Sequence, residues 1–187
     1  MHPLFRIVSW KSKYDIEFKG LKEGLHDYEF DIENKFFEHF DESLVEAGEV
    51  RVKVQLEKRS AFLKLKFEFD GWVELTCDRC LEPYKQDIEL DTEMFVKFGL
   101  ESEFDEGDNV IWVLPDEHVL NLAQVIYEFT MLSIPLKHVH PNKKGENSCD
   151  SEMMAELDKY RYTDTEEKED DEIDPRWAAL KNLKNNN

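Results

Sequence analysis

Two cysteines at C-x2-C spacing, Cys77 and Cys80, are the residues of this sequence with the clearest capacity for chemistry. The remaining cysteine, Cys149, lies in a turn-rich segment far downstream that also contains His138 and His140. Thiolates and imidazoles are ligands that zinc prefers, and a structural zinc site uses four of them. If the two segments meet, the cysteine pair supplies half of a tetrahedral structural zinc site, and two of the three downstream residues complete it.

The same cysteines fit other interpretations. They can be reduced thiols without a metal, with Cys77 packed inward, because it shares the parity of the apolar residues Val73 and Leu75. A thioredoxin-like redox role fits less well, since that motif belongs at the start of a helix and this pair follows a predicted strand. The downstream residues match no usual ligand spacing, so the choice between zinc and metal-free thiols stays open.

A clear strand pattern leads into the cysteine pair. Apolar residues occupy the even positions of 50–56 and the odd positions of 63–77, and they alternate again over 88–98. Alternation at every second residue predicts strands with one buried and one exposed face. Gly71 is in phase with the second set, so we predict one long strand with a bend or bulge there. The three strands should form an antiparallel β-meander.

One amphipathic helix should cover the apolar face of this meander. Asn121 and Gln124 resemble a capping box, and Pro135 ends the helical pattern. Between them, apolar residues recur at helical spacing: Leu122, Val125, Ile126, Phe129 and Leu132. Upstream, alternation over 14–18 and 28–32 predicts a further pair of strands. The fold class expected from these elements is α+β.

The chain is expected to form a single α+β domain over residues 1–160, followed by an acidic linker and a short amphipathic segment over 161–187. Eight carboxylates and one lysine fall between positions 164 and 174. Such a block repels itself and buries too little apolar surface to fold, which predicts a disordered acidic tail. Beyond it, Trp177 and Leu180 either dock back onto the domain or bind a partner.

The charge of the chain limits the partners it can bind. A formal net charge of -19 repels phosphate backbones and favours basic partners. Positive side chains group on the exposed faces of two predicted neighbouring strands: Arg51, Lys53, Lys64 and Lys66. This group is either an RNA-contacting stripe or the ordinary polar alternation of a solvent-facing strand.

Other features of the sequence narrow the class of protein. No apolar run approaches the roughly 20 residues that a membrane span needs, and the first residues do not form an export signal, so we expect a cytoplasmic protein with reduced cysteines and no membrane contact. We find no nucleophile elbow, phosphate-binding glycine loop or H-E-x-x-H motif. We therefore expect no enzymatic activity and no small-molecule substrate.

Three segments together resemble the YceD-like family, the large ribosomal RNA subunit accumulation proteins of bacteria. They are CDRCLEPY at 77–84, YEFTMLSIPLKHVHP at 127–141 with Cys149-Asp150 after it, and DPRWAALKNL at 174–183. The resemblance implies a role in the synthesis, processing or stability of large-subunit ribosomal RNA, without an established enzymatic activity. Many relatives carry more cysteines in the second segment, where this chain has His138, His140 and Cys149.

Three functions follow as hypotheses. In the first, the protein is a non-enzymatic accessory factor whose main contact is basic, such as a ribosomal protein or an intermediate of large-subunit assembly, and its contact with RNA is indirect. In the second, the basic sheet face contacts RNA and the acidic tail is an autoinhibitory decoy. In the third, which has the least support, the protein is a zinc-dependent enzyme, although a catalytic zinc needs an open coordination position that the ligand set does not offer.

Overall fold

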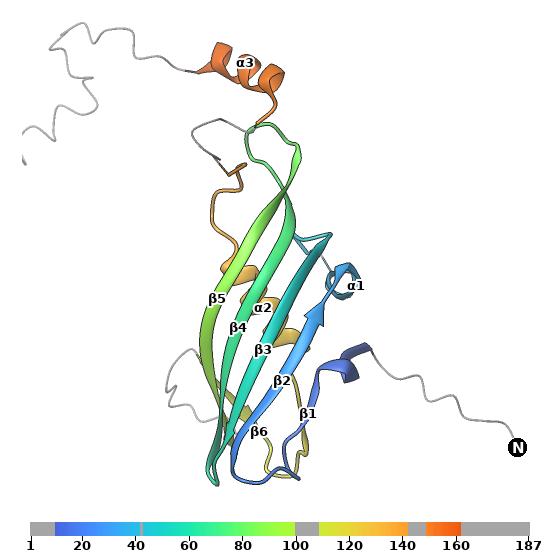
Figure 1. Cartoon of the computed structure of the whole chain (residues 1–187), viewed down its shortest axis with the longest axis vertical. Coiled ribbons are helices and arrows are strands. Elements are labelled where there is room, and N and C mark those ends of the chain that lie inside the picture. Colours follow the sequence, from blue (N-terminus) through green and yellow to red (C-terminus); the bar gives the residue numbers. More distant parts are fainter. Residues whose placement is uncertain (1–9, 42, 100–108, 142–148, 162–187) are drawn as a thin grey trace, which may run out of the picture. The chain divides into compact units, whose positions relative to one another are not determined.

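The computed structural model describes residues 10–41, 43–99, 109–141 and 149–161 (Figure 1). The chain divides into a unit that ends at Asp150 and a unit that begins at Ser151. The described part of the second unit is essentially one helix, α3 (Ser151–Tyr160), which buries none of its side chains. The acidic tail predicted over 161–187, with Trp177 and Leu180, lies outside the described residues apart from Arg161, and the predicted domain limits stay predictions.

A five-stranded sheet with the order β2-β3-β4-β5-β6 forms the body of the first unit. The first four strands pair antiparallel with their neighbours, and the last pairs parallel with β5. Their bounds are β2 (Gly24–Ile32), β3 (Gly48–Lys58), β4 (Phe62–Thr76), β5 (Pro83–Phe98) and β6 (Val110–Val113). The predicted meander corresponds to β3, β4 and β5, so the α+β, antiparallel-rich fold class is confirmed.

Helix α2 (Ala123–Ser133) lies across the apolar face of this sheet, as predicted (Figure 1). The ring of Phe129 packs against the rings of Phe67 and Phe69 on β4, with centroid distances of 5.4 and 6.2 Å. Ile126 is completely buried. Burying large apolar side chains between a helix and a sheet is the main favourable term in such a two-layer fold.

The start and the buried stripe of this helix differ from the prediction. Asn121 belongs to β7 and its side chain accepts a hydrogen bond from the Ala123 amide at 3.2 Å, but Gln124 bonds to Glu128 rather than back to Asn121. The helix turns Thr130 inward and leaves Leu132 76 % exposed. The hydroxyl of Thr130 is satisfied by the carbonyl of Ile126, which makes its burial tolerable.

The predicted pairing of the two N-terminal strands is wrong. Strand β1 (Asp15–Glu17) pairs antiparallel with β7 (Val119–Asn121) in a separate two-stranded sheet, and β2 pairs with β3. Sequence alternation gives the buried face of a strand but carries no information about which strand lies beside it. The remaining helical elements are short: the 3-10 helix η1 (Trp10–Tyr14) and α1 (Asn34–Phe37).

Strand β4 is continuous through Gly71, and of the predicted bend or bulge the bulge is absent. Asp70, Gly71 and Trp72 each have one partner on β3 and one on β5. The glycine is required by a close approach of the neighbouring backbone, because a Cβ at this position would lie 2.1 Å from the carbonyl oxygen of Glu49. Its φ of +159° is also one that L side chains rarely adopt.

Candidate metal centre

The six-residue turn between β4 and β5 positions the first two cysteines. The Cys77 amide donates to the Glu82 carbonyl at 3.0 Å, and the Leu81 amide donates to the Cys77 carbonyl at 3.0 Å. Leu81 adopts a positive φ of 61°, which a tight turn demands and which costs a non-glycine residue about 1 kcal/mol or more. The turn holds Cys77 and Cys80 with their side chains buried.

A second turn is fixed against the first by a reciprocal pair of hydrogen bonds. The Asp78 amide donates to the His138 carbonyl at 2.6 Å, and the His138 amide donates to the Asp78 carboxylate at 2.8 Å. Pro135 ends α2 and sends the chain toward this contact. Two residues after this contact, His140 reaches the cysteines. Asp78 was not among the residues singled out from the sequence, although its place between the two cysteines could have marked it.

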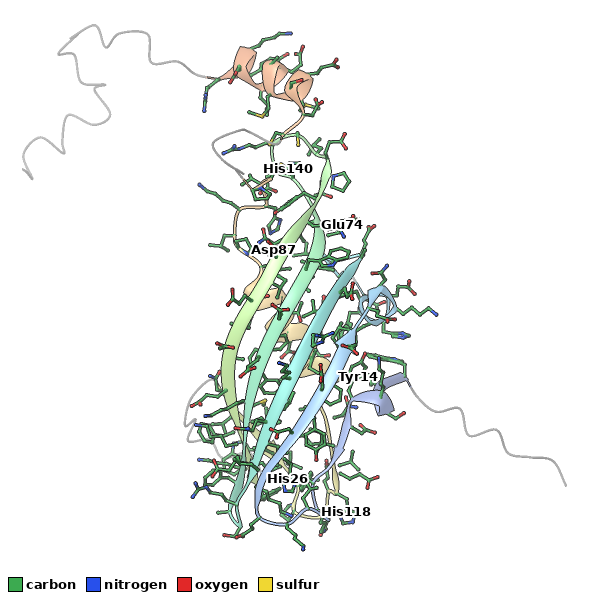
Figure 2. All side chains as sticks on the ribbon, in the orientation of Figure 1. Tyr14, His26, Glu74, Asp87, His118 and His140 are labelled. Atoms are coloured by element: carbon green, nitrogen blue, oxygen red, sulfur yellow. The ribbon has the colours of Figure 1, made fainter. Side chains whose placement is uncertain are left out.

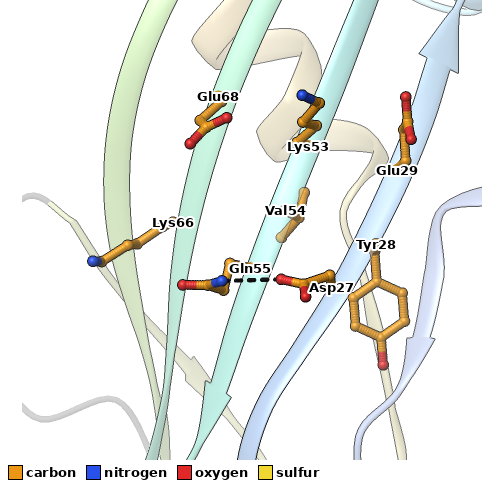
Figure 3. A pocket seen from close by; sticks show the side chains of 8 residues that line it. All are labelled: Asp27, Tyr28, Glu29, Lys53, Val54, Gln55, Lys66 and Glu68. Atoms are coloured by element: carbon orange, nitrogen blue, oxygen red, sulfur yellow. Dashed lines mark hydrogen bonds between the residues drawn. The ribbon is translucent and has the colours of Figure 1, made fainter.

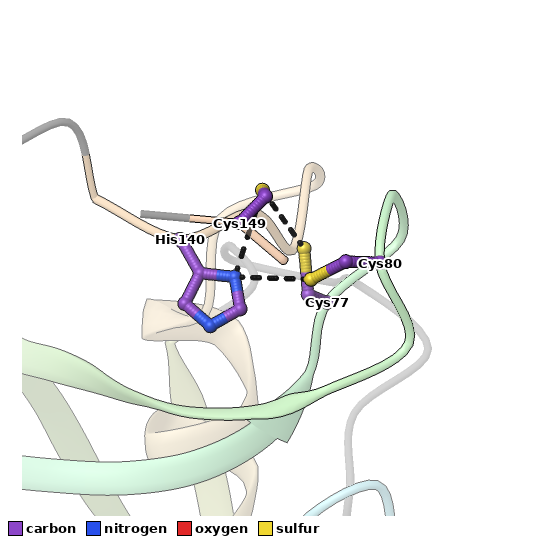
Figure 4. Close-up of side chains that lie close together, drawn as sticks. All are labelled: Cys77, Cys80, His140 and Cys149. Carbon is purple, nitrogen blue, oxygen red and sulfur yellow. Dashed lines mark hydrogen bonds between the residues drawn. The ribbon is translucent and has the colours of Figure 1, made fainter. Parts of the chain in front are cut away.

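Four side chains converge between the two turns (Figure 4). The ligand atoms of Cys77, Cys80, His140 and Cys149 all lie within 4.8 Å of one another. The Nδ1 atom of His140 is 3.4 Å from the Cys80 sulfur and 3.7 Å from the Cys149 sulfur. The sulfurs of Cys77 and Cys149 are 3.9 Å apart. These four residues form a Cys3His cluster that could hold a metal ion.

The fifth candidate ligand, His138, takes a different position. Its Nδ1 atom faces the Asp78 carboxylate at 4.0 Å, and it is not one of the four converging residues. Both histidines lie in the irregular segment after α2, where His140 turns toward Cys80 while His138 stays beside Asp78. Two further histidines are distant from the cluster: Figure 2 shows His26 and His118 at the opposite end of the sheet from His140.

The surroundings of Cys77 and Cys149 shift the pKa values of these two thiols in opposite directions. Burial acts to raise the pKa of Cys77, but hydrogen bonds from the backbone amides of Cys80, Arg79 and His140 and from the His140 ring outweigh it and lower this pKa to about 6. Burial and the neighbouring thiols raise the pKa of Cys149 to about 11. The turn between β4 and β5 thus holds Cys77 largely as a thiolate at neutral pH, and the thiolate is the form of cysteine that binds metals.

The four basic candidate site residues lie on the face of the sheet opposite α2, which we call the open face. Arg51 and Lys53 belong to β3, and Lys64 and Lys66 to β4. Arg51 is 3.1 and 3.5 Å from carboxylates of Glu29 and Asp31 on β2, and Lys64 is 2.8 Å from Glu93 on β5.

A shallow hollow of about 380 Å³ on the open face lies around Lys53 and Lys66 (Figure 3). It is lined by both signs of charge, and its Gln55 amide donates to Asp27 at 3.0 Å. Together with the ion pairs of Arg51 and Lys64, this arrangement means that the four cations are interspersed among carboxylates and do not form an uninterrupted basic stripe.

The fold and the cluster define a small α+β protein in which two turns at one end of an antiparallel sheet bring together three thiols and an imidazole. The chain belongs to the family described as large ribosomal RNA subunit accumulation protein YceD, whose model matches residues 65–184. This range includes both turns of the cluster. No curated protein and no solved structure matches the chain. None of the helices in the described residues is both long and apolar enough to cross a membrane.

Proposed function

We propose that this protein is a non-enzymatic accessory factor in the accumulation of large-subunit ribosomal RNA and that it acts in the cytoplasm through a basic partner. The family description supplies the connection with large-subunit ribosomal RNA. The nature of the partner is inferred from the charge on the open face. A ribosomal protein awaiting assembly, or an assembly intermediate that exposes one, has the required chemistry.

The observation that carries this proposal is a set of opposed carboxylates on β4 and β5. Glu68 lies directly across from Asp91, and Asp70 directly across from Glu89. Like charges at opposed positions of two strands destabilise a sheet, by up to roughly 1 kcal/mol for each pair. On the other side of β4, Lys53 lies across from Glu68 and Arg51 across from Asp70. Among the described residues, however, no cation forms an ion pair with any of the four carboxylates, and Arg51 is engaged by Glu29 and Asp31, so the repulsion between β4 and β5 is only partly relieved.

A basic partner would relieve it. Lysine or arginine side chains placed between the opposed carboxylates would remove the repulsion and add attraction, which steers association and suppresses wrong partners. The net charge of -19 favours the same class of partner over the whole molecule. Contact of the open face with RNA phosphates is disfavoured for the converse reason, since Arg51 and Lys64 are already engaged by carboxylates.

The test is capture of partners on the immobilised full chain at low and high salt. We expect basic ribosomal proteins at low salt and their release at high salt, and we expect a variant with Glu68→Gln, Asp70→Asn, Glu89→Gln and Asp91→Asn to lose them. A control variant changes the same number of exposed carboxylates elsewhere: Glu23→Gln, Glu38→Gln, Asp116→Asn and Glu117→Gln. Retention of bare RNA without any basic protein would reject the proposal.

We further propose that the Cys3His cluster holds a structural zinc ion. Zinc–sulfur and zinc–nitrogen bonds of about 2.3 and 2.0–2.1 Å in a tetrahedron place two sulfurs about 3.8 Å apart and a sulfur and a nitrogen about 3.6 Å apart. The corresponding distances here are 3.9 Å between Cys77 and Cys149, and 3.4 and 3.7 Å between His140 and the sulfurs of Cys80 and Cys149. Four protein ligands close the site, which is typical of a structural role.

Elemental analysis of the purified protein tests this second proposal. We expect about one zinc per chain in the wild type and in His138→Ala, and none in Cys80→Ser. Zinc would join three distant parts of the sequence, the β4–β5 turn, the segment after α2 and Cys149, so its loss should also lower the melting temperature. A fully folded wild type without bound metal would show that the thiols serve another purpose.

A further inference from the structure

A second hollow lies away from both the metal centre and the opposed carboxylates, between η1 and α1. It has a volume of about 420 Å³, within the range of pockets that bind small ligands or single nucleotides. Four of its lining residues come from η1 and the others from α1 and its flanks: Trp10, Ser12, Lys13, Tyr14, Glu33, Lys35, Phe36 and His39. Neither proposal above uses any of them.

An aromatic stack forms one wall of this hollow. The rings of Trp10 and His39 lie parallel, with centroids 4.2 Å apart and planes 11° apart. Trp10 is half-buried and meets Phe36 and Phe40 edge-on, so the core fixes its orientation. His39 is exposed and forms the outer end of the stack. A planar ring held in this way is a platform on which a further planar ring can stack.

The floor of the hollow contains a hydroxyl with an unused hydrogen-bonding capacity. Tyr14 is 4 % exposed, and its hydroxyl makes no hydrogen bond within the described part of the chain. Among the described residues, no fully buried polar side-chain atom lacks a partner, so the unpartnered Tyr14 hydroxyl is not fully buried. Tyr14 lines the hollow, which is where this hydroxyl can meet a ligand. Burial and the nearby Glu33 carboxylate raise the pKa of Tyr14 to about 12, which keeps the phenol protonated at neutral pH.

The lining of the hollow carries a small excess of positive charge in an otherwise acidic protein. It contains two lysines, Lys13 and Lys35, and one carboxylate, whereas the whole chain contains 43 Asp and Glu against 24 Lys and Arg. Lys13 donates to the neutral carbonyl of Asp31 at 3.1 Å and keeps its charge uncompensated by that contact. Lys35 makes no ion pair with the described residues, and Glu33 is the only carboxylate that lines the hollow. Two ammonium groups therefore stand beside an aromatic platform.

We propose that this hollow binds one nucleotide of single-stranded RNA, with the base stacked on His39, the phosphate held by Lys13 and Lys35, and the ribose hydroxyl between Tyr14 and Glu33. Sites that bind single-stranded nucleic acid combine an aromatic ring, on which a base stacks, with positive side chains that hold the phosphate. The hollow contains both. A neutral phenol beside a carboxylate offers the donor and the acceptor that a 2′-hydroxyl requires, which distinguishes RNA from DNA. The assignment rests on the proposed role in ribosomal RNA accumulation and adds a direct, local RNA contact to it.

The test is fluorescence anisotropy of a labelled single-stranded RNA decamer, and of DNA of the same sequence, with the full chain at several salt concentrations. We expect His39→Ala to weaken RNA binding roughly 5- to 150-fold. We expect Lys35→Gln to make the slope of log affinity against log salt less steep by about 0.7, the value for one phosphate contact with a single strand. Tyr14→Phe should remove the preference for RNA over DNA.

Two control variants carry the same chemical changes at exposed positions outside the hollow: Lys22→Gln and Tyr160→Phe. Equal binding by all variants, displacement of the RNA by a polyglutamate peptide at equal charge, or an absence of RNA binding by the wild type would each overturn the assignment. These outcomes leave the capture of basic proteins by Glu68, Asp70, Glu89 and Asp91 unaffected, so a failure here is distinct from a failure of the proposed partner.

Discussion

Replacing Asp78 with alanine should weaken metal binding although Asp78 is not a ligand. Its carboxylate accepts a hydrogen bond from the His138 amide at 2.8 Å. This bond holds the segment that contains His140 against the turn that contains Cys77 and Cys80. A hydrogen bond to a charged acceptor contributes about 1.5–3 kcal/mol, but this carboxylate is 55 % exposed, which reduces the contribution to about 1 kcal/mol. Since about 1.4 kcal/mol corresponds to a factor of ten, we expect a loss of zinc affinity of about 5-fold, somewhat less than the 10–100-fold usual for outer partners of ligands.

Competition with a chromophoric chelator measures this change. Glu82→Ala is the matched control, because Glu82 lies in the same turn and contributes its backbone carbonyl, which the substitution preserves. Cys80→Ser, which removes a ligand, gives the reference for complete loss. The reasoning is refuted if Asp78→Ala binds zinc as tightly as Glu82→Ala does, since the hydrogen bond between His138 and Asp78 would then have no influence on the position of His140.

Three further outcomes are expected. Gly71→Ala should destabilise the fold by about 2–4 kcal/mol in thermal unfolding, because its Cβ would meet the backbone of Glu49, whereas Gly20→Ala, with nothing within 4 Å of an added Cβ, should not. Metal-free protein should gain thiolate absorbance at 240 nm with a midpoint near pH 6, and Cys77→Ser should abolish this step. The folded-state pKa of Cys77 lies below the ordinary value of 9.0, so the Cys77 thiolate contributes stability that is complete above pH 9 and is lost as the pH falls through about 6. If the free energy of unfolding of the metal-free protein did not change over this pH range, the assignment of a thiolate to Cys77 would be wrong.

The fold was predictable from the sequence where burial alone decides the structure. Strict alternation over 50–56, 63–77 and 88–98 gave the buried face of β3, β4 and β5, and helical spacing before Pro135 gave α2. The pairing of β1 with β7 was not predictable, because it joins residues about a hundred positions apart and depends on the path of the whole chain. The exposure of Leu132 was missed because Thr130 satisfies its hydroxyl within the helix and takes an inward position.

For the candidate metal site, residue types were predictable and geometry was not. The C-x2-C spacing and the downstream histidines identified five ligand candidates, and the structure brings four of them together. Nothing in the spacing distinguished His140 from His138, since the choice depends on the path of an irregular segment past the two cysteines. The hydrogen bonds between Asp78 and His138 hold that segment in place, which a one-dimensional pattern cannot show.

The most direct test of the account is the ratio of large- to small-subunit ribosomal RNA in cells depleted of this protein and supplied with variants. The wild type and the variant with control carboxylates changed at 23, 38, 116 and 117 should restore the ratio. The variant with Glu68, Asp70, Glu89 and Asp91 neutralised should fold, retain its metal and fail to restore it. Full restoration by that variant would contradict the claim that the open face binds the partner through which this protein acts.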